Sequence, residues 1–270
     1  MLTRIVSGVV GAALMICVLL FGGPWGLAAL MGLAAAVAVF ELLRAAGFGW
    51  GERLPAMAVA AAAPLLYLWC PTALLLAAGA YWLYAVVIAV VRHGTLPPER
   101  VGLLWLLPTA AVAGFTALAA LRNEPEGLFL VFLTLVIPWL SDTGAYFTGV
   151  AFGKHKLCPV ISPKKTVEGL IGGILFAMLA AAATGWLYGL WCGHPVQLCW
   201  WGILLAAAVG TPLSVFGDLF ASVVKRRFGV KDYGKIMPGH GGVMDRFDSV
   251  LPTAIWLWLL TRVISLITTV

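Results

Sequence analysis

Long runs of apolar residues constrain the fold of this chain more than any other feature of its sequence. A helix needs about 20 residues to cross a hydrocarbon core of roughly 30 Å. The sequence contains nine candidate stretches: 5–22, 25–46, 55–70, 72–91, 101–121, 127–147, 167–191, 197–221 and 250–267. These stretches are apolar on all sides, whereas a membrane β-strand alternates apolar and polar residues. The sequence therefore predicts an all-α, polytopic integral membrane protein with about nine transmembrane helices.

The composition supports this fold class. Hydrophobic residues make up 62% of the chain and charged residues 10%, whereas soluble domains carry about 25% charge. We find no linker, soluble domain or internal repeat, so we expect a single membrane domain over residues 1–270. Residues 1–125 are expected to form an apolar helical scaffold, and residues 126–270 carry both polar segments.

The distribution of basic residues predicts the orientation of the helices. With the amino terminus inside, all of the 17 Lys and Arg residues except Arg122 and Arg262 fall on the cytoplasmic side. Such an excess is what the positive-inside rule requires. We therefore expect a multi-pass protein of the inner cell membrane, with both polar segments facing the cytoplasm.

All aspartates and lysines lie in two polar segments of the second half. The first comprises residues 141–173. Its second residue, Asp142, lies at the end of an apolar run, where an ionised carboxylate is costly unless it is paired, hydrated or bound to a metal. Asp142 is therefore a candidate for the site, although an interhelical hydrogen bond or an arginine partner would also explain it.

Glycines and lysines follow Asp142 in the first segment. Glycine lets a backbone approach a ligand closely, and lysine supplies a point charge that suits phosphate. The candidates for substrate binding here are Lys164, Lys165 and Thr166. Lysines are also expected at any cytoplasmic loop, Ser162 and Glu168 fit an ordinary helix start, and Gly169 and Gly173 indicate close helix packing.

The second polar segment, residues 216–249, contains three aspartates near the predicted ends of two spans. Asp245 and Asp248 are three residues apart, so on a helix they would share a face and repel each other unless a cation lies between them. Mg²⁺ binds one or two carboxylates together with substrate phosphates. Asp218, approaching from the neighbouring helix, would complete the protein ligands.

Basic and glycine residues lie between these aspartates. Lys225, Arg226 and Lys231 could bind a polyphosphate, and the glycine turn at 238–242 could present backbone N–H groups to an anion. The alternative for residues 225–227 is a topological anchor or a contact with anionic lipid. His240 alone would more often be structural, but the whole group within one short segment indicates a site.

The second segment resembles the signature of the phosphatidate cytidylyltransferases, also called CDP-diacylglycerol synthases. The similar residues are Ser222, Lys225, Arg226, Lys231, Asp232, Gly234, Pro238, His240, Gly241, Gly242, Asp245, Arg246 and Asp248. Two upstream groups resemble that family too: Ser141, Asp142, Ala145 and Tyr146, and then Ser162, Pro163, Lys165, Thr166, Glu168 and Gly169. The likeness covers the second half of the chain. Met237 and Val167 depart from the usual residues, each apolar for apolar.

The resemblance implies that CMP is transferred from CTP to phosphatidic acid, giving CDP-diacylglycerol and pyrophosphate. It also implies a requirement for Mg²⁺, with a second, monovalent cation left open, and a homodimer. On this basis the expected metal ligands are Asp218, Asp245 and Asp248, and the expected catalytic residues are Asp218, Asp245, Lys225, Arg226 and His240. The expected substrate-binding residues are Asp142, Lys164, Lys165, Thr166, Lys231, Gly241, Gly242 and Arg246.

Two other classes of function remain open from the residues alone. A transporter or channel would carry its charged groups near the bilayer midplane, often in broken helices, whereas here the charges gather at one face. A CTP-dependent lipid kinase, or a cytidylyltransferase for another lipid phosphate, would need similar residues. Nothing in the pattern itself identifies cytosine or the lipid.

Overall fold

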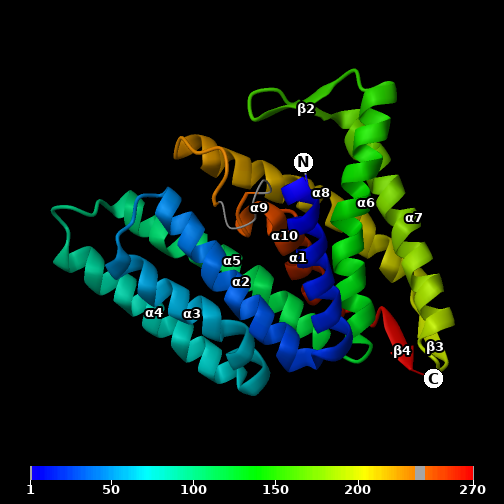
Figure 1. Ribbon diagram of the computed structural model, residues 1–270, viewed down its shortest axis with the longest axis horizontal. Coiled ribbons are helices and arrows are strands. Elements are labelled where there is room, and N and C mark those ends of the chain that lie inside the picture. Colours follow the sequence, from blue (N-terminus) through cyan, green and yellow to red (C-terminus); the bar gives the residue numbers. More distant parts are fainter. Residues whose placement is uncertain (1, 235–240, 270) are drawn as a thin grey trace. The chain divides into compact units, whose positions relative to one another are not determined.

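The computed structural model describes residues 2–234 and 241–269, and most of them are helical (Figure 1). The helices are α1 (Leu2–Phe21), α2 (Gly23–Ala45), α3 (Trp50–Trp69), α4 (Pro71–Val91), α5 (Pro98–Arg122), α6 (Gly127–Phe152), α7 (Val167–Trp191), α8 (Trp200–Arg227), α9 (Met244–Phe247) and α10 (Val250–Thr261). The strands are β1 (Lys156–Cys158), β2 (Ser162–Thr166), β3 (Val196–Leu198) and β4 (Ile267–Thr269).

The prediction of an all-α, polytopic membrane protein is confirmed. Within the described residues, six helices are long and apolar enough to cross a membrane, namely α2, α4, α5, α6, α7 and α8. Each of the nine predicted spans overlaps a helix, but the exact number of nine is not confirmed. The final apolar helix, α10, has only 12 residues.

The predicted helix over residues 250–267 is wrong in its last third. The helix ends at Thr261, and residues 267–269 form β4, which pairs antiparallel with β3. The amide of Cys199 also donates a hydrogen bond to the carbonyl of Leu266 (3.0 Å). An apolar run does not by itself distinguish a strand from a helix, and β3 supplies the backbone partners that make the strand possible.

The chain divides into two compact units. The first contains residues 1–120 and 225–247, and the second contains residues 121–224 and 248–270. The expectation of one membrane domain over residues 1–270 stays a prediction.

Small residues bring α2 and α3 together in the first unit. Ala28, Ala35 and Ala60 are fully buried, and a Cβ atom added at Gly32 would overlap the carbonyl of Ala61. Without a hydrophobic driving force between helices in lipid, such close packing supplies much of the attraction. Helix α2 also contacts α9, which belongs to the second polar segment.

Glycines allow α6 and α7 to pack closely in the second unit. A Cβ atom at Gly169 would lie 2.9 Å from the Ala145 carbonyl oxygen, and one at Gly173 would lie 2.9 Å from that of Ser141. These glycines face α6 at van der Waals distance, which confirms the packing role that their spacing indicates. The two helices form the most extensive helix pair of this unit.

Replacing Gly173 with Ala should destabilise the protein by about 1–3 kcal/mol, because the added methyl group meets a backbone carbonyl that cannot rotate away. The matched control is Gly79→Ala in α4, where a Cβ atom meets nothing within 4 Å. Thermal unfolding in detergent measures the difference. A Gly173→Ala protein as stable as the control would contradict this packing.

A short β-hairpin connects α6 to α7, where the sequence indicated only a loop. β1 pairs antiparallel with β2, and the amide of Val167 donates to the carbonyl of His155 (2.9 Å). The predicted span over 167–191 agrees with α7, whereas the alternative of a helix start at Ser162 is wrong, because residues 162–166 form β2. The N-cap of α7 is Thr166, whose hydroxyl accepts from the amide of Gly169 (3.1 Å). A threonine hydroxyl can satisfy a free N–H group at the start of a helix, as a serine hydroxyl can.

The other end of α6 carries a separate set of polar contacts. Glu124 pairs with Arg262, and the Tyr188 hydroxyl donates to the Glu126 carboxylate (2.5 Å). In the second unit, therefore, Arg262 lies at the end of α6 opposite to the hairpin. This separation within the unit agrees with the basic-residue pattern, which sets Arg262 apart from the lysines of the hairpin.

Candidate active site

In the second unit, one lysine joins two of the predicted site carboxylates. The ammonium nitrogen of Lys165, in β2, lies 2.6 Å from Oδ2 of Asp218, in α8. Both side chains also interact electrostatically with Asp142 of α6. We call these three residues the Asp218 cluster. The structure thus brings together residues from both polar segments, as the sequence predicted.

The hairpin determines where Lys165 points. Burial increases toward the end of β2, where Lys164 is exposed and Lys165 is half-buried. The next residue, Thr166, is buried against glycines of α6, since a Cβ atom at Gly149 or Gly153 would lie 3.0 Å from its hydroxyl oxygen. Thr166, a predicted substrate-binding residue, therefore serves here as a helix cap that fixes the end of β2.

Glu168 holds the other strand of the hairpin. Its carboxylate accepts hydrogen bonds from the amides of Lys154 (3.1 Å) and His155 (3.2 Å), and Nδ1 of His155 lies 2.6 Å from it. The sequence indicated only a first-turn carboxylate at this position. Glu168 thus connects the start of α7 to the start of the hairpin.

Asp248 lies beside α8 in the same unit. The residue is 8% exposed, its Oδ1 accepts from the amide of Ser249 (2.8 Å), and a Cβ atom at Gly217 would overlap the backbone carbonyl oxygen of Asp248. The backbone at Asp248 therefore contacts α8 next to Asp218. The expected helical face shared by Asp245 and Asp248 is absent, because α9 ends at Phe247 and α10 begins at Val250.

In the first unit, Asp245 is held by three groups. Its Oδ1 lies 3.0 Å from the ammonium nitrogen of Lys225, and its Oδ2 accepts from the amides of Tyr233 (2.8 Å) and Gly242 (2.9 Å). The Asp245 side chain is only 6% exposed, and the Lys225 nitrogen also lies 5.4 Å from the centre of the Tyr233 ring. We call Lys225, Tyr233, Gly242 and Asp245 the Asp245 cluster.

Two residues of α2 contact the same segment and were missed by the sequence analysis. The carboxylate of Glu41 accepts from the amides of Val243 and Met244, and Nη2 of Arg44 donates to the carbonyl of Tyr233. The available signal was Glu41 itself, a carboxylate inside an apolar run, which is as costly there as Asp142. The division into an apolar scaffold and a polar second half obscured that signal.

The remaining predicted residues divide by exposure. Lys164, Arg226, Lys231 and Arg246 are exposed, and Gly241 adopts a positive φ of 86° beside Asp245. His240 lies outside the described residues. The eighth predicted span, 197–221, ends too early, because α8 continues without a break from Asp218 past Lys225 and ends at Arg227.

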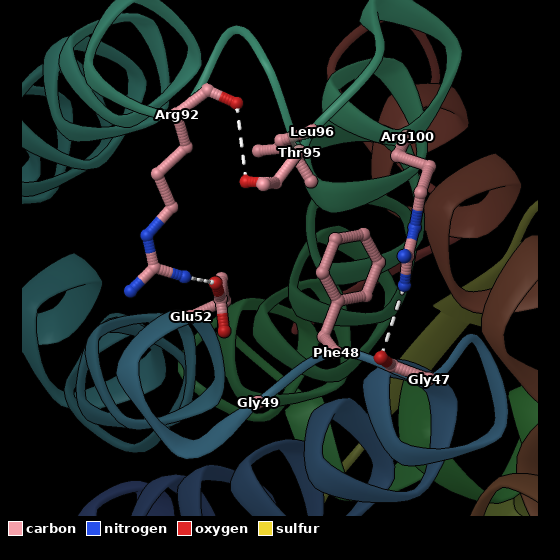
Figure 2. A pocket seen from close by; sticks show the side chains of 8 residues that line it. All are labelled: Gly47, Phe48, Gly49, Glu52, Arg92, Thr95, Leu96 and Arg100. Atoms are coloured by element: carbon pink, nitrogen blue, oxygen red, sulfur yellow. Dashed lines mark hydrogen bonds and ion pairs between the residues drawn. The ribbon is translucent and has the colours of Figure 1, made fainter.

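A polar pocket of about 140 Å³ lies in the first unit, at the α2–α3 and α4–α5 turns (Figure 2). It is lined by Gly47, Phe48, Gly49, Glu52, Arg92, Thr95, Leu96 and Arg100. Glu52 pairs with Arg92, and Arg100 donates to the carbonyl of Gly47 (2.9 Å) and stacks on Phe48. These contacts join the two turns, and none of the lining residues is a predicted site residue.

The chemistry of the aspartates suits Mg²⁺, a hard cation that prefers oxygen ligands. A carboxylate offers about four acceptor positions, so Asp218, beside Lys165, and Asp248, beside Ser249, can each accept a further ligand. In the described part of the chain, no three His, Cys, Asp or Glu side chains form a group able to hold a metal ion. Substrate phosphates and water would therefore supply other ligands.

The chain belongs to the cytidylyltransferase family, whose family model matches residues 2–264. Among similar curated proteins, the phosphatidate cytidylyltransferase of Staphylococcus epidermidis is 43% identical over 145 residues, which are 54% of this chain and 54% of that protein. The phosphatidate cytidylyltransferases of Staphylococcus aureus and Staphylococcus saprophyticus are 42% and 39% identical over the same length and shares. The chain thus matches about half the length of these relatives.

Proposed function

We propose that this protein transfers CMP from CTP to phosphatidic acid, forming CDP-diacylglycerol and pyrophosphate for phospholipid biosynthesis. Family membership and the names of the relatives support the reaction. The structural observation that carries the proposal is the pairing of a site carboxylate with a lysine in each unit, Asp218 with Lys165 and Asp245 with Lys225. Each pair presents fixed charge of both signs, which a reaction between phosphates requires.

The reaction needs positioning and charge neutralisation more than covalent help from the protein. An oxygen of the lipid phosphate attacks the α-phosphorus of CTP, a P–O bond forms there, and the bond to the β-phosphate breaks. Pyrophosphate leaves with that bond's electron pair. Lys165 and Lys225 are placed to neutralise phosphate oxygens, and the aspartates orient the lysines, so catalysis rests on fixed electrostatics.

We include Mg²⁺ as the cofactor, with Asp218 and Asp248 of the second unit and Asp245 of the first as candidate ligands that would act together with substrate phosphates. When bound, it would supply the positive charge that stabilises the leaving pyrophosphate. Asp142 beside Lys165 would keep that lysine oriented when Asp218 turns toward the metal. Arg226, Lys231, Lys164 and Arg246 are exposed and available to the phosphates of CTP.

The direct test is an assay of the purified chain in detergent micelles containing phosphatidic acid. We expect CDP-diacylglycerol to appear only when CTP, phosphatidic acid and Mg²⁺ are all present, and EDTA should abolish its formation. Diacylglycerol in place of phosphatidic acid is the matched control substrate. Product formation from diacylglycerol, or none from phosphatidic acid, would contradict the proposal.

We further propose that the site faces the cytoplasm from the inner membrane, and the homodimer stays a prediction. Cysteines placed at Lys164 and Arg227, in a background without the five native cysteines, should resist an impermeant maleimide in intact cells and react after permeabilisation. Gln197→Cys, at the opposite end of the second unit, should react without permeabilisation. Labelling of positions 164 and 227 from outside would reverse the assigned orientation.

A further inference from the structure

Helix α2 presents a carboxylate and a guanidinium three residues apart, and three residues bring two side chains to the same helical face. The carboxylate of Glu41, with 0% exposure, accepts from the amides of Val243 (3.2 Å) and Met244 (3.0 Å). The guanidinium of Arg44 donates to the carbonyl of Tyr233 (2.6 Å). One helix of the apolar half therefore holds the second polar segment at two points.

The backbone of that segment approaches Glu41 more closely than a side chain would allow. A Cβ atom added at Gly234 or at Gly242 would overlap the Glu41 carboxylate. Both glycines lie in the family-like pattern of the sequence, and the sequence alone assigned no role to Gly234. Because neither glycine has a side chain, the buried Glu41 carboxylate can reach the amides of Val243 and Met244.

These contacts adjoin the groups that hold Asp245. Tyr233 donates its amide to Asp245 and gives its carbonyl to Arg44. The amide of Gly242 donates a hydrogen bond to Asp245, and the amide of the next residue, Val243, donates one to Glu41. Both backbone donors of Asp245 are therefore fixed by peptides that α2 anchors, and displacement of either peptide would move the Asp245–Lys225 pair.

We propose that Glu41 and Arg44 are positioning residues for the cytidylyl transfer, acting through the Asp245–Lys225 pair; this inference rests on the proposed function. A buried carboxylate is a poor source of stability, since an apolar side chain of similar volume often packs as well. Its two charge-assisted hydrogen bonds instead fix one loop conformation, because bonds to an ionised acceptor are about twice as strong as neutral ones.

The first test is Glu41→Gln, which keeps the size of the side chain and removes its charge. We expect kcat to fall by about tenfold or more with the KM values for CTP and phosphatidic acid unchanged, because a shift of roughly 1 Å at a reacting group can cost about a hundredfold. Amide hydrogen exchange at residues 241–245 should quicken. Glu52→Gln, another buried glutamate of the first unit, paired with Arg92, is the control and should change neither.

A double-mutant cycle separates positioning from general stability. If Glu41 acts through Asp245, Glu41→Gln should lower turnover by less than about twofold in an Asp245→Asn protein, whereas independent effects would multiply. Arg44→Gln at the exposed end of α2 provides a second variant if Glu41→Gln does not fold, and the same loss of kcat is expected.

If Glu41→Gln or Arg44→Gln kept the wild-type kcat and the wild-type amide hydrogen exchange, the inference would be overturned. It would also be overturned if the loss of turnover in the double mutant equalled the product of the losses in the two single mutants. A wild-type chain that makes no CDP-diacylglycerol would instead overturn the proposed function. In that case the exchange measurement at residues 241–245 still decides whether Glu41 holds this segment.

Discussion

Replacing Asp245 with Asn should reduce the rate of CDP-diacylglycerol synthesis by at least about a hundredfold, the scale on which a lost charge-stabilising contact affects catalysis. The substitution keeps the size of the side chain but removes the charge that lies 3.0 Å from Lys225. The NH₂ group of the new Asn side chain must also point either toward Lys225 or toward the amides of Tyr233 and Gly242. All of these groups are donors, so the NH₂ group would meet no acceptor there. Steady-state turnover at saturating CTP and phosphatidic acid measures the loss.

Asp232→Asn is the matched control for this experiment. Asp232 lies in the same polar segment but is exposed, and exposed ion pairs contribute little, so its replacement should cost far less activity. Circular dichroism and thermal unfolding should show that both proteins are folded. Equal losses at Asp232 and Asp245 would argue against a specific role for the Asp245 cluster.

A second large effect is expected at Asp218. Asp218→Asn removes the carboxylate that lies 2.6 Å from Lys165 and leaves that lysine with Asp142 alone in the cluster. If Asp218 also binds Mg²⁺, turnover should fall by at least about a hundredfold, and the Mg²⁺ concentration for half-maximal rate should rise. Turnover measured over a range of Mg²⁺ concentrations separates the two effects.

Glu124→Gln is the control for Asp218. Glu124 pairs with Arg262 at the opposite end of the second unit, and the exposure of that pair (28% and 43%) is close to that of Asp218 and Lys165 (37% and 25%). We expect near-normal turnover in Glu124→Gln. If this variant lost as much activity as Asp218→Asn, the effect would reflect the loss of any ion pair in this unit.

The sequence predicted the helices well because one physical requirement dominates it. In lipid every backbone polar group must be paired within the protein, so an apolar run of about 20 residues has little choice but to be helical. The close packing at Gly169 and Gly173 could also be predicted, since a four-residue glycine spacing places both on one helical face.

Elements formed by long-range pairing could not be predicted in this way. β4 needs β3 as its partner, about 70 residues away along the chain, and residues 262–267 alone look like the end of a helix. The hairpin over residues 156–166 carries lysines and prolines rather than the alternating pattern of a strand. Its position depends on Glu168 and Thr166, whose contacts with residues 149–155 appear only in three dimensions.

The candidate site was predicted in its acidic and basic residues but not in its pairings. Charge and spacing identified Asp218, Asp245 and Lys225, whereas the partnership of Lys165 with Asp218 depends on how β2 approaches α8. Glu41 was missed because a single carboxylate among apolar residues carries no spacing pattern. Only the structure relates it to a segment about 200 residues later.

The fate of labelled phosphate tests the central claim most directly. The purified chain would be incubated with phosphatidic acid, Mg²⁺ and CTP labelled either at the α-phosphate or at the γ-phosphate. Transfer of CMP predicts that the α-label enters the lipid fraction as CDP-diacylglycerol and that the γ-label is released as pyrophosphate. Entry of the γ-label into lipid would show a kinase, and retention of both labels in CTP would show that this chain does not catalyse the reaction.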